Sequence, residues 1–167
     1  MELKSRIENR SEVTAICYRL VGSYPTLDYA LAWQHLMEYC REKQLPQDCS
    51  DAEYLNLYLD DCTTTPAEQC RVDVCIASQV VKGLEPSSTV GICTIEGGRY
   101  IVYLVKGDYK EVLAPAYQQI YGKLLKQAGV ELLPKPMFEK YLNDPETTAP
   151  EELLTEIWIP IADKILH

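Results

Sequence analysis

The chain repeats itself, and this internal duplication constrains its fold more than any other feature of the sequence. The segment "LDDCTTTPAEQ" at 59–69 returns as "NDPETTAPEEL" at 143–153, with an offset of 84 residues. The same offset, to within one residue, aligns "LVGSYPTLDYALAWQ" at 20–34 with "LVKGDYKEVLAPAYQ" at 104–118. Two matching blocks in the same order predict that the two halves of the chain fold alike.

The first half predicts two strands, a helix and two more strands. The β-branched and aromatic run "EVTAICYRLVG" ends at Gly22 and is typical of a strand. Pro25 suits the first turn of a helix, and the helical pattern continues to about Lys43. "EYLNLYLDD" and "CRVDVCIAS" predict the strands that follow. The expected buried face of the helix, with Trp33 near its centre, consists of Tyr29, Ala30, Trp33, Leu36, Met37 and Cys40.

The second half repeats this order. Its strands "TVGICTIEG" and "RYIVYLVKG" meet at a turn of Gly97 and Gly98, and "MELKSRIEN" corresponds to the first of them. Residues 109–127 predict a helix, but Pro115 removes a hydrogen bond, so its regular part is expected to begin near Ala114 or to kink there. "KPMFEKYLN" and "LLTEIWIPI" complete the half. The expected buried helix face consists of Leu113, Ala116, Tyr117, Ile120 and Leu124.

This order predicts the α+β class, with tandem pseudo-twofold repeats, an antiparallel sheet and two main helices. We expect a single domain over residues 1–167, with internal repeats at about 1–80 and 88–163. Ligand sites favour the junctions of duplicated units, so a small-molecule pocket is expected between the two repeats.

Charge and cysteine content narrow the classes of partner and cofactor. The 167 residues carry a formal net charge of −9, which disfavours direct binding to nucleic acid, because Lys and Arg must neutralise its phosphates. The seven cysteines include no C-x-x-C pair, so we expect no metal site, no disulfide framework and no cofactor. No apolar stretch is long enough to span a membrane and no signal peptide begins the chain, which predicts a cytoplasmic protein.

The strand "KPMFEKYLN" carries the most informative side chain. Its alternation places Glu139 between Met137 and Tyr141 on one face. At the offset of 84, the counterpart of Glu139 is Leu55 and that of Tyr141 is Leu57, so a carboxylate is expected in one repeat only. A partly buried carboxylate favours an apolar cation as ligand, and aromatic faces add cation–π attraction. The predicted ligand-binding residues are Glu139, Tyr141, Trp33, Tyr109, Tyr24, Tyr103 and Leu57.

Two alternatives to a binding site remain open at Glu139. In the first, Glu139 is a solvated residue on an outer strand face, and the tyrosines are ordinary core residues. In the second, burial makes Glu139 a general base, with a tyrosine hydroxyl as the donor. No nucleophile motif or Ser-His-Asp arrangement accompanies it, so binding is favoured over catalysis.

Several motifs resemble those of the GyrI-like small-molecule-binding family. They are "RLVGSYPTLDYALAWQHLMEY", "YLDDCTTTPAEQCRVDVCI", "IEGGRYIVYLVKGDY" and "ELLPKPMFEKYLND". The family includes the DNA gyrase inhibitory protein and the effector-binding domains of multidrug-responsive transcription regulators. The resemblance covers residues 3–161 and implies two strand-helix-strand-strand repeats with an effector pocket at their junction. It also implies that Glu139, the glutamate of the "FExY" motif, faces aromatic residues, and that Tyr141 is the tyrosine of that motif.

Three functions follow from this resemblance. The favoured one is a stand-alone protein that binds an apolar, cationic small molecule, because no helix-turn-helix domain is expected outside residues 3–161. The second is an inhibitor that contacts DNA gyrase, a basic partner that suits an acidic surface. The third is a hydrolase of reactive, cyclopropane-type compounds, with Glu139 as general base and Tyr141 beside it.

Overall fold

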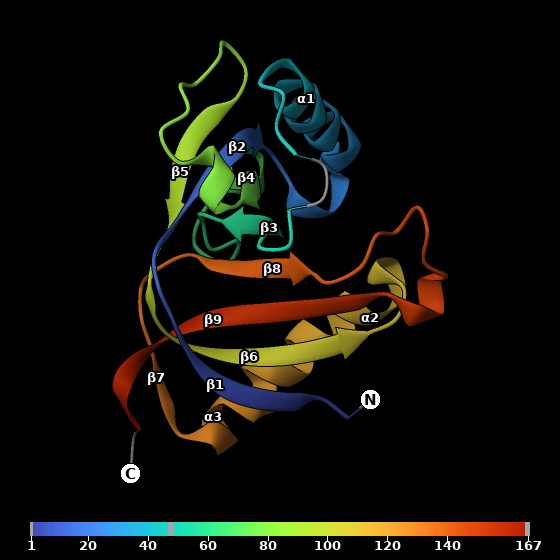
Figure 1. Ribbon diagram of the computed structural model, residues 1–167. Helices are drawn as coiled ribbons and strands as arrows, with labels where there is room; N and C mark the ends of the chain where they lie inside the picture. The colour runs from blue at the N-terminus through green and yellow to red at the C-terminus, as the bar shows by residue number, and fades with distance from the viewer. Residues whose placement is uncertain (1, 47–48, 166–167) are drawn as a thin grey trace. The chain divides into compact units, whose positions relative to one another are not determined.

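The computed structural model describes residues 2–46 and 49–165 of the chain (Figure 1). The chain forms two compact units, an internal unit of residues 11–97 and a terminal unit of residues 1–10 and 98–167. Each unit contains an antiparallel sheet and a main helix, which confirms the predicted α+β class. Within the described ranges, no helix is long and apolar enough to cross a membrane.

In the internal unit, helix α1 packs on one face of an antiparallel sheet with the strand order β3-β4-β2-β5. Asp28 caps this helix by accepting a hydrogen bond from the backbone N–H of Leu31 at 3.0 Å. Ile16 of β2 and Val74 of β4 face α1 and form the core with Leu36. The elements are β2 (Val13–Val21), η1 (Tyr24–Thr26), α1 (Tyr29–Glu42), β3 (Glu53–Tyr58), η2 (Ala67–Gln69), β4 (Arg71–Ala77), η3 (Gln79–Val81) and β5 (Gly91–Ile95).

In the terminal unit, helix α2 packs on an antiparallel sheet with the order β1-β6-β9-β8, and β7 also pairs with β9. Tyr103 of β6 and Ile157 of β9 face the helix and form the core with Ala116 and Ile120. The elements are β1 (Lys4–Arg10), β6 (Gly98–Lys106), α2 (Tyr109–Gln119), the π-helical segment η4 (Ile120–Leu124), α3 (Leu125–Ala128), β7 (Val130–Leu132), β8 (Met137–Tyr141), η5 (Pro150–Glu152) and β9 (Leu154–Ile165).

The two halves of the sequence exchange their first strands. Strand β1 pairs with β6 of the second half, and β5 pairs with β2 of the first half. The predicted hairpin of "TVGICTIEG" with "RYIVYLVKG" is therefore wrong. A two-residue type I′ hairpin turn needs a positive φ at both central residues, whereas Gly98 has a φ of 135° and Gly97 has no positive φ.

The buried face of α1 is rotated relative to the prediction. Ala32, Leu36 and Tyr39 are buried, whereas Trp33 is half-buried at the edge of the core and Met37 is exposed. Tyr39 can enter the core because its hydroxyl donates a hydrogen bond to the carbonyl oxygen of Glu85 at 2.5 Å. The predicted face left out Ala32 and Tyr39, and it was therefore rotated about the helix axis from the observed one.

The second helix begins earlier than Pro115 led us to expect. It starts at Tyr109, and the side chain of Asp108 caps it by accepting a hydrogen bond from the N–H of Lys110 at 3.0 Å. Pro115 lies inside the regular helix, and the irregular turn is the π-helical segment further on. The cap and the packing of Ala116 on the sheet compensate for the hydrogen bond that proline removes.

Candidate ligand-binding site

Glu139 points to the helix-covered face of the terminal sheet. It pairs with Ile157 of β9, which in turn pairs with Tyr103 of β6. Directly paired residues share a face, so Glu139 lies on the side where α2 packs. Its side chain is 4% exposed. The alternative of a solvated residue on an outer strand face is therefore wrong.

Two tyrosine hydroxyls hold the carboxylate of Glu139. Tyr117 of α2 donates a hydrogen bond to Oε2 at 2.5 Å, and Tyr141 of β8 donates one to Oε1 at 2.6 Å. Hydrogen bonds to an ionised acceptor are shorter and stronger than neutral ones. Both donor–acceptor distances lie within the range of about 2.5–2.7 Å for a hydroxyl that donates to a carboxylate. One donor comes from the helix and one from the strand, so the packing of α2 on the sheet fixes the carboxylate.

Further aromatic rings and one sulfur atom lie around Glu139 and its two tyrosine donors. The ring of Tyr109 meets that of Tyr141 edge-on at 5.4 Å, and Tyr121 stacks on Tyr117 at 6.4 Å. The Tyr121 hydroxyl lies 3.6 Å from Sδ of Met137. Burial raises the pKa of Tyr109, and the negative charges of Asp144 and Glu139 raise it further, so its hydroxyl is neutral at physiological pH. The site therefore combines one buried negative charge with neutral aromatic rings.

The structural repeat has a different register from the one predicted for this strand. The N–H of Leu59 bonds the carbonyl oxygen of Arg71, as that of Leu142 bonds Leu154, each at 3.0 Å. These equivalent bonds set an offset of 83 residues. A slip of one residue moves every side chain to the other face of a strand.

The counterpart of Glu139 is therefore Asn56, and the counterpart of Tyr141 is Tyr58. Asn56 pairs with Val74, a core residue beneath α1. The prediction that Leu55 and Leu57 hold these positions is wrong, because they pair with Cys75 and Asp73. These pairs lie on the sheet face that points away from α1.

The other predicted residues lie elsewhere. Tyr103 is 2% exposed in the core beneath α2. Trp33, Tyr24 and Leu57 belong to the internal unit. Trp33 lies on α1 with its ring 6.1 Å from that of Tyr54, and Leu57 is buried on the helix-free face. The placement of the pocket between the repeats stays a prediction.

Tyr24 has a structural role that its position in the sequence did not reveal. Its hydroxyl donates a hydrogen bond to the carbonyl oxygen of Arg71 at 2.8 Å and accepts one from the N–H of Asp60 at 3.2 Å. Burial raises its pKa to about 12. Its ring meets that of Tyr58 edge-on at 4.9 Å, the same arrangement that Tyr109 and Tyr141 adopt in the terminal unit.

The domain family of the chain follows from comparison with known proteins. The family model of the GyrI-like small molecule binding domain matches residues 3–162. The chain belongs to the GyrI-like family. A protein of Escherichia coli (strain K12) named DNA gyrase inhibitor is 36% identical over 139 residues, which cover 83% of this chain and 85% of the relative.

Two solved structures share the GyrI-like fold at low sequence identity. EcmrR, solved in a complex with DNA, superposes with a TM-score of 0.76 and 16% identity over 97% of this chain. The chain spans 58% of the length of EcmrR in that complex. SAV2435, solved with bound tetraphenylphosphonium, superposes with a TM-score of 0.66 and 14% identity, covering 96% of this chain and 94% of SAV2435.

Within this GyrI-like site, sequence reasoning missed Tyr117 and Tyr121 as neighbours of Glu139, whereas it placed Met137 on the same strand face as Glu139. The repeat itself held the signal for Tyr117, because the offset of 84 aligns it with Trp33, which was a predicted site residue. Tyr117 had instead been assigned to the buried helix face. The role of Glu139 as a general base, with Tyr141 as its partner, stays a prediction.

Proposed function

We propose that the chain binds an apolar organic cation at Glu139. The observation that carries this proposal is a carboxylate that is 4% exposed and is held by two tyrosine hydroxyls among aromatic rings. Removing a carboxylate from water costs free energy, and hydrogen bonds from neutral hydroxyls offset part of that cost. A cation close to the carboxylate offsets the remainder.

The chemistry of the lining favours a cation with a delocalised or shielded charge. Tyr117 and Tyr141 already direct their hydroxyl protons at Glu139, so their rings are the surfaces left for a ligand. Each ring face adds roughly 0.5–2 kcal/mol of cation–π attraction. An ammonium group rich in N–H donors needs further acceptors, whereas a phosphonium or quaternary ammonium ion does not. The complex of SAV2435 with tetraphenylphosphonium supports the same choice of ligand class.

Calorimetric titration of the full chain with tetraphenylphosphonium tests this proposal. We expect saturable binding that weakens about 10- to 100-fold in Glu139→Gln, because the substitution removes one charge at contact distance. Glu131→Gln is the matched control, since Glu131 is an exposed carboxylate of β7 in the same unit. Tetraphenylborate, an anion of the same shape, should bind neither protein. Equal affinity of wild type and Glu139→Gln would remove Glu139 from the site.

A second candidate function is inhibition of DNA gyrase by direct contact. It is favoured by the 36% identity to the E. coli protein named DNA gyrase inhibitor and by the net charge of −9, which suits a basic partner. A supercoiling assay with purified bacterial gyrase and micromolar protein tests it. We expect relaxed plasmid to persist as the protein is added and supercoiling to recover at raised salt. Unchanged supercoiling at every protein concentration would exclude this function.

A further inference from the structure

Three cysteines that are distant in sequence meet on the helix-free face of the internal sheet. Cys17 of β2 pairs directly with Cys75 of β4, and Cys93 of β5 pairs with Ala15, two residues from Cys17. All three side chains therefore lie on one face of three adjacent strands. The Sγ atoms of Cys75 and Cys93 are 3.7 Å apart.

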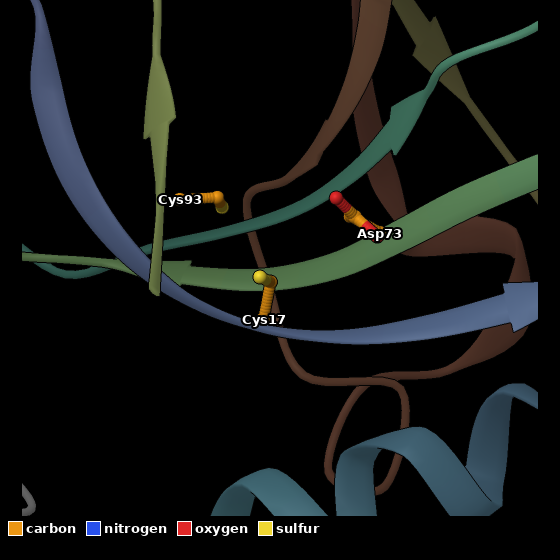
Figure 2. A group of neighbouring side chains, drawn as sticks. All are labelled: Cys17, Asp73 and Cys93. Carbon is orange, nitrogen blue, oxygen red and sulfur yellow. The ribbon is translucent and has the colours of Figure 1, made fainter. Parts of the chain in front are cut away.

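A carboxylate joins this cluster. Asp73 lies two residues before Cys75 on β4 and is 2% exposed. Its oxygen and the sulfurs of Cys17 and Cys93 lie within 4.8 Å of one another, and Figure 2 shows these three side chains converging from three strands. Arg19 donates to both oxygens of Asp73, from Nε at 2.8 Å and from Nη2 at 2.9 Å, and so fixes the orientation of the carboxylate.

A nucleophilic role does not fit this environment. A reactive thiolate needs an adjacent base or cation that is available to stabilise it, whereas Arg19 donates to both oxygens of Asp73. A disulfide between Cys75 and Cys93 does not fit either. Both cysteines are free, their strands are not neighbours because both flank β2, and their Sγ atoms are 3.7 Å apart, well beyond the disulfide bond length of about 2.05 Å.

We propose that Cys17, Cys93 and Asp73, whose ligand atoms converge, bind one zinc ion, and that Cys75, whose Sγ lies 3.7 Å from that of Cys93, supplies the fourth ligand. Tetrahedral zinc with Zn–S bonds of about 2.3 Å holds its sulfurs about 3.8 Å apart, close to the separation of Cys75 and Cys93. Thiolate and carboxylate are both zinc ligands, and three thiolates with one carboxylate supply the four ligands of a tetrahedral site. The bidentate hydrogen bonds from Arg19 orient the ligating carboxylate from the outer shell.

This inference departs from the expectation of no metal site, which was based on sequence spacing. Cys17, Cys75 and Cys93 come from three strands, and only Asp73 and Cys75 are close in sequence. It is independent of the proposed cation site, because Glu139 belongs to the terminal unit.

Metal titration of the reduced, metal-free full chain tests the proposal. We expect one equivalent of zinc to be retained against a chromophoric chelator, and one equivalent of Co²⁺ to give intense tetrahedral d–d bands with thiolate-to-metal charge transfer. Cys93→Ala should weaken zinc binding at least about 100-fold, since it removes one ligand of four. Cys40→Ala is the matched control, because Cys40 lies on α1 at the opposite face of the same sheet.

Three outcomes would overturn the zinc site. The first is octahedral, weakly absorbing Co²⁺ in the wild type. The second is equal zinc affinity in Cys93→Ala and Cys40→Ala, with circular dichroism showing that both are folded. The third is a wild-type chain that takes up no zinc under reducing conditions and that, in air, loses two hydrogen atoms to oxygen as two thiols form a disulfide. Tetraphenylphosphonium affinity should be the same in Cys93→Ala as in wild type, which separates this test from that of the proposed function.

Discussion

Replacing Tyr117 with phenylalanine should destabilise the protein by about 1.5–3 kcal/mol, the range for a hydrogen bond to a charged group. The variant removes a hydroxyl that donates to Oε2 of Glu139 at 2.5 Å and keeps the ring that stacks on Tyr121. The carboxylate is 4% exposed, so water does not readily replace the lost donor. For a chain of this size the loss corresponds to a decrease in Tm of about 3–12 °C.

Urea unfolding at neutral pH, without added ligand, measures this loss. Tyr121→Phe is the control one helical turn further on, because Tyr121 is 45% exposed and water can hydrogen-bond in place of its hydroxyl. It should cost less than about 0.5 kcal/mol. A double-mutant cycle with Glu139→Gln isolates the charged part of the interaction, because a neutral amide accepts a hydrogen bond worth only about 0.5–1.5 kcal/mol.

Two results would contradict this reasoning. A loss below about 0.5 kcal/mol in Tyr117→Phe would mean that the short contact does not stabilise the folded state. An equal loss in the wild-type and Glu139→Gln backgrounds would mean that the Tyr117 hydroxyl stabilises the protein through packing. The coupling free energy between this hydroxyl and the charge of Glu139 would then be zero.

Two further predictions concern the scaffold. The side-chain hydrogen bonds of Arg71 lower the pKa of Asp60. Ionised Asp60 therefore stabilises the folded state at pH values above the pKa that Asp60 has in the unfolded chain. This stabilisation is lost as the pH falls through the lower pKa of the folded state. The difference in urea midpoint between wild type and Asp60→Asn should therefore shrink from pH 7 to acid, and a constant difference would refute the ion pair. Gly107→Ala should lower stability by about 1–3 kcal/mol, since its Cβ would meet Val112 at 2.6 Å at a positive φ, whereas Gly98→Ala, with open space, should cost less in the same thermal melt.

The duplication was sufficient to predict the fold class, because two copies of one alternating pattern must bury two similar faces. It could not predict that β1 pairs with β6 and β5 with β2. Alternation reports which face of a strand is buried, but it does not identify the neighbouring strand. The short link at Gly97 and Gly98 suggested a hairpin, but β5 pairs with β2 and β6 pairs with β1, and Gly97 lacks the positive φ of a type I′ turn.

The site was predicted in part for a related reason. The sequence repeat aligned Asp60 with Asp144 at an offset of 84, because the two residues are identical. The hydrogen bonds show instead that the structural counterpart of Asp60 is Asn143. Asp60 accepts from the N–H of Arg71, as Asn143 accepts from the N–H of Leu154, at an offset of 83. The sequence match placed the counterpart of Glu139 on the wrong strand face. The loop residues match at an offset of 84, whereas the adjoining strands are equivalent at an offset of 83.

With the register corrected, the two units differ in charge at the position of Glu139. Each unit has an edge-on tyrosine pair, Tyr24 with Tyr58 and Tyr109 with Tyr141, at equivalent places. Between strand and helix, however, the internal unit has the neutral Asn56 where the terminal unit has Glu139. Both side chains are polar and buried, so the scaffold supports a polar group there in either unit. The change that distinguishes them is the negative charge, and this is why the sign of the ligand's charge, more than its shape, should decide what the site binds.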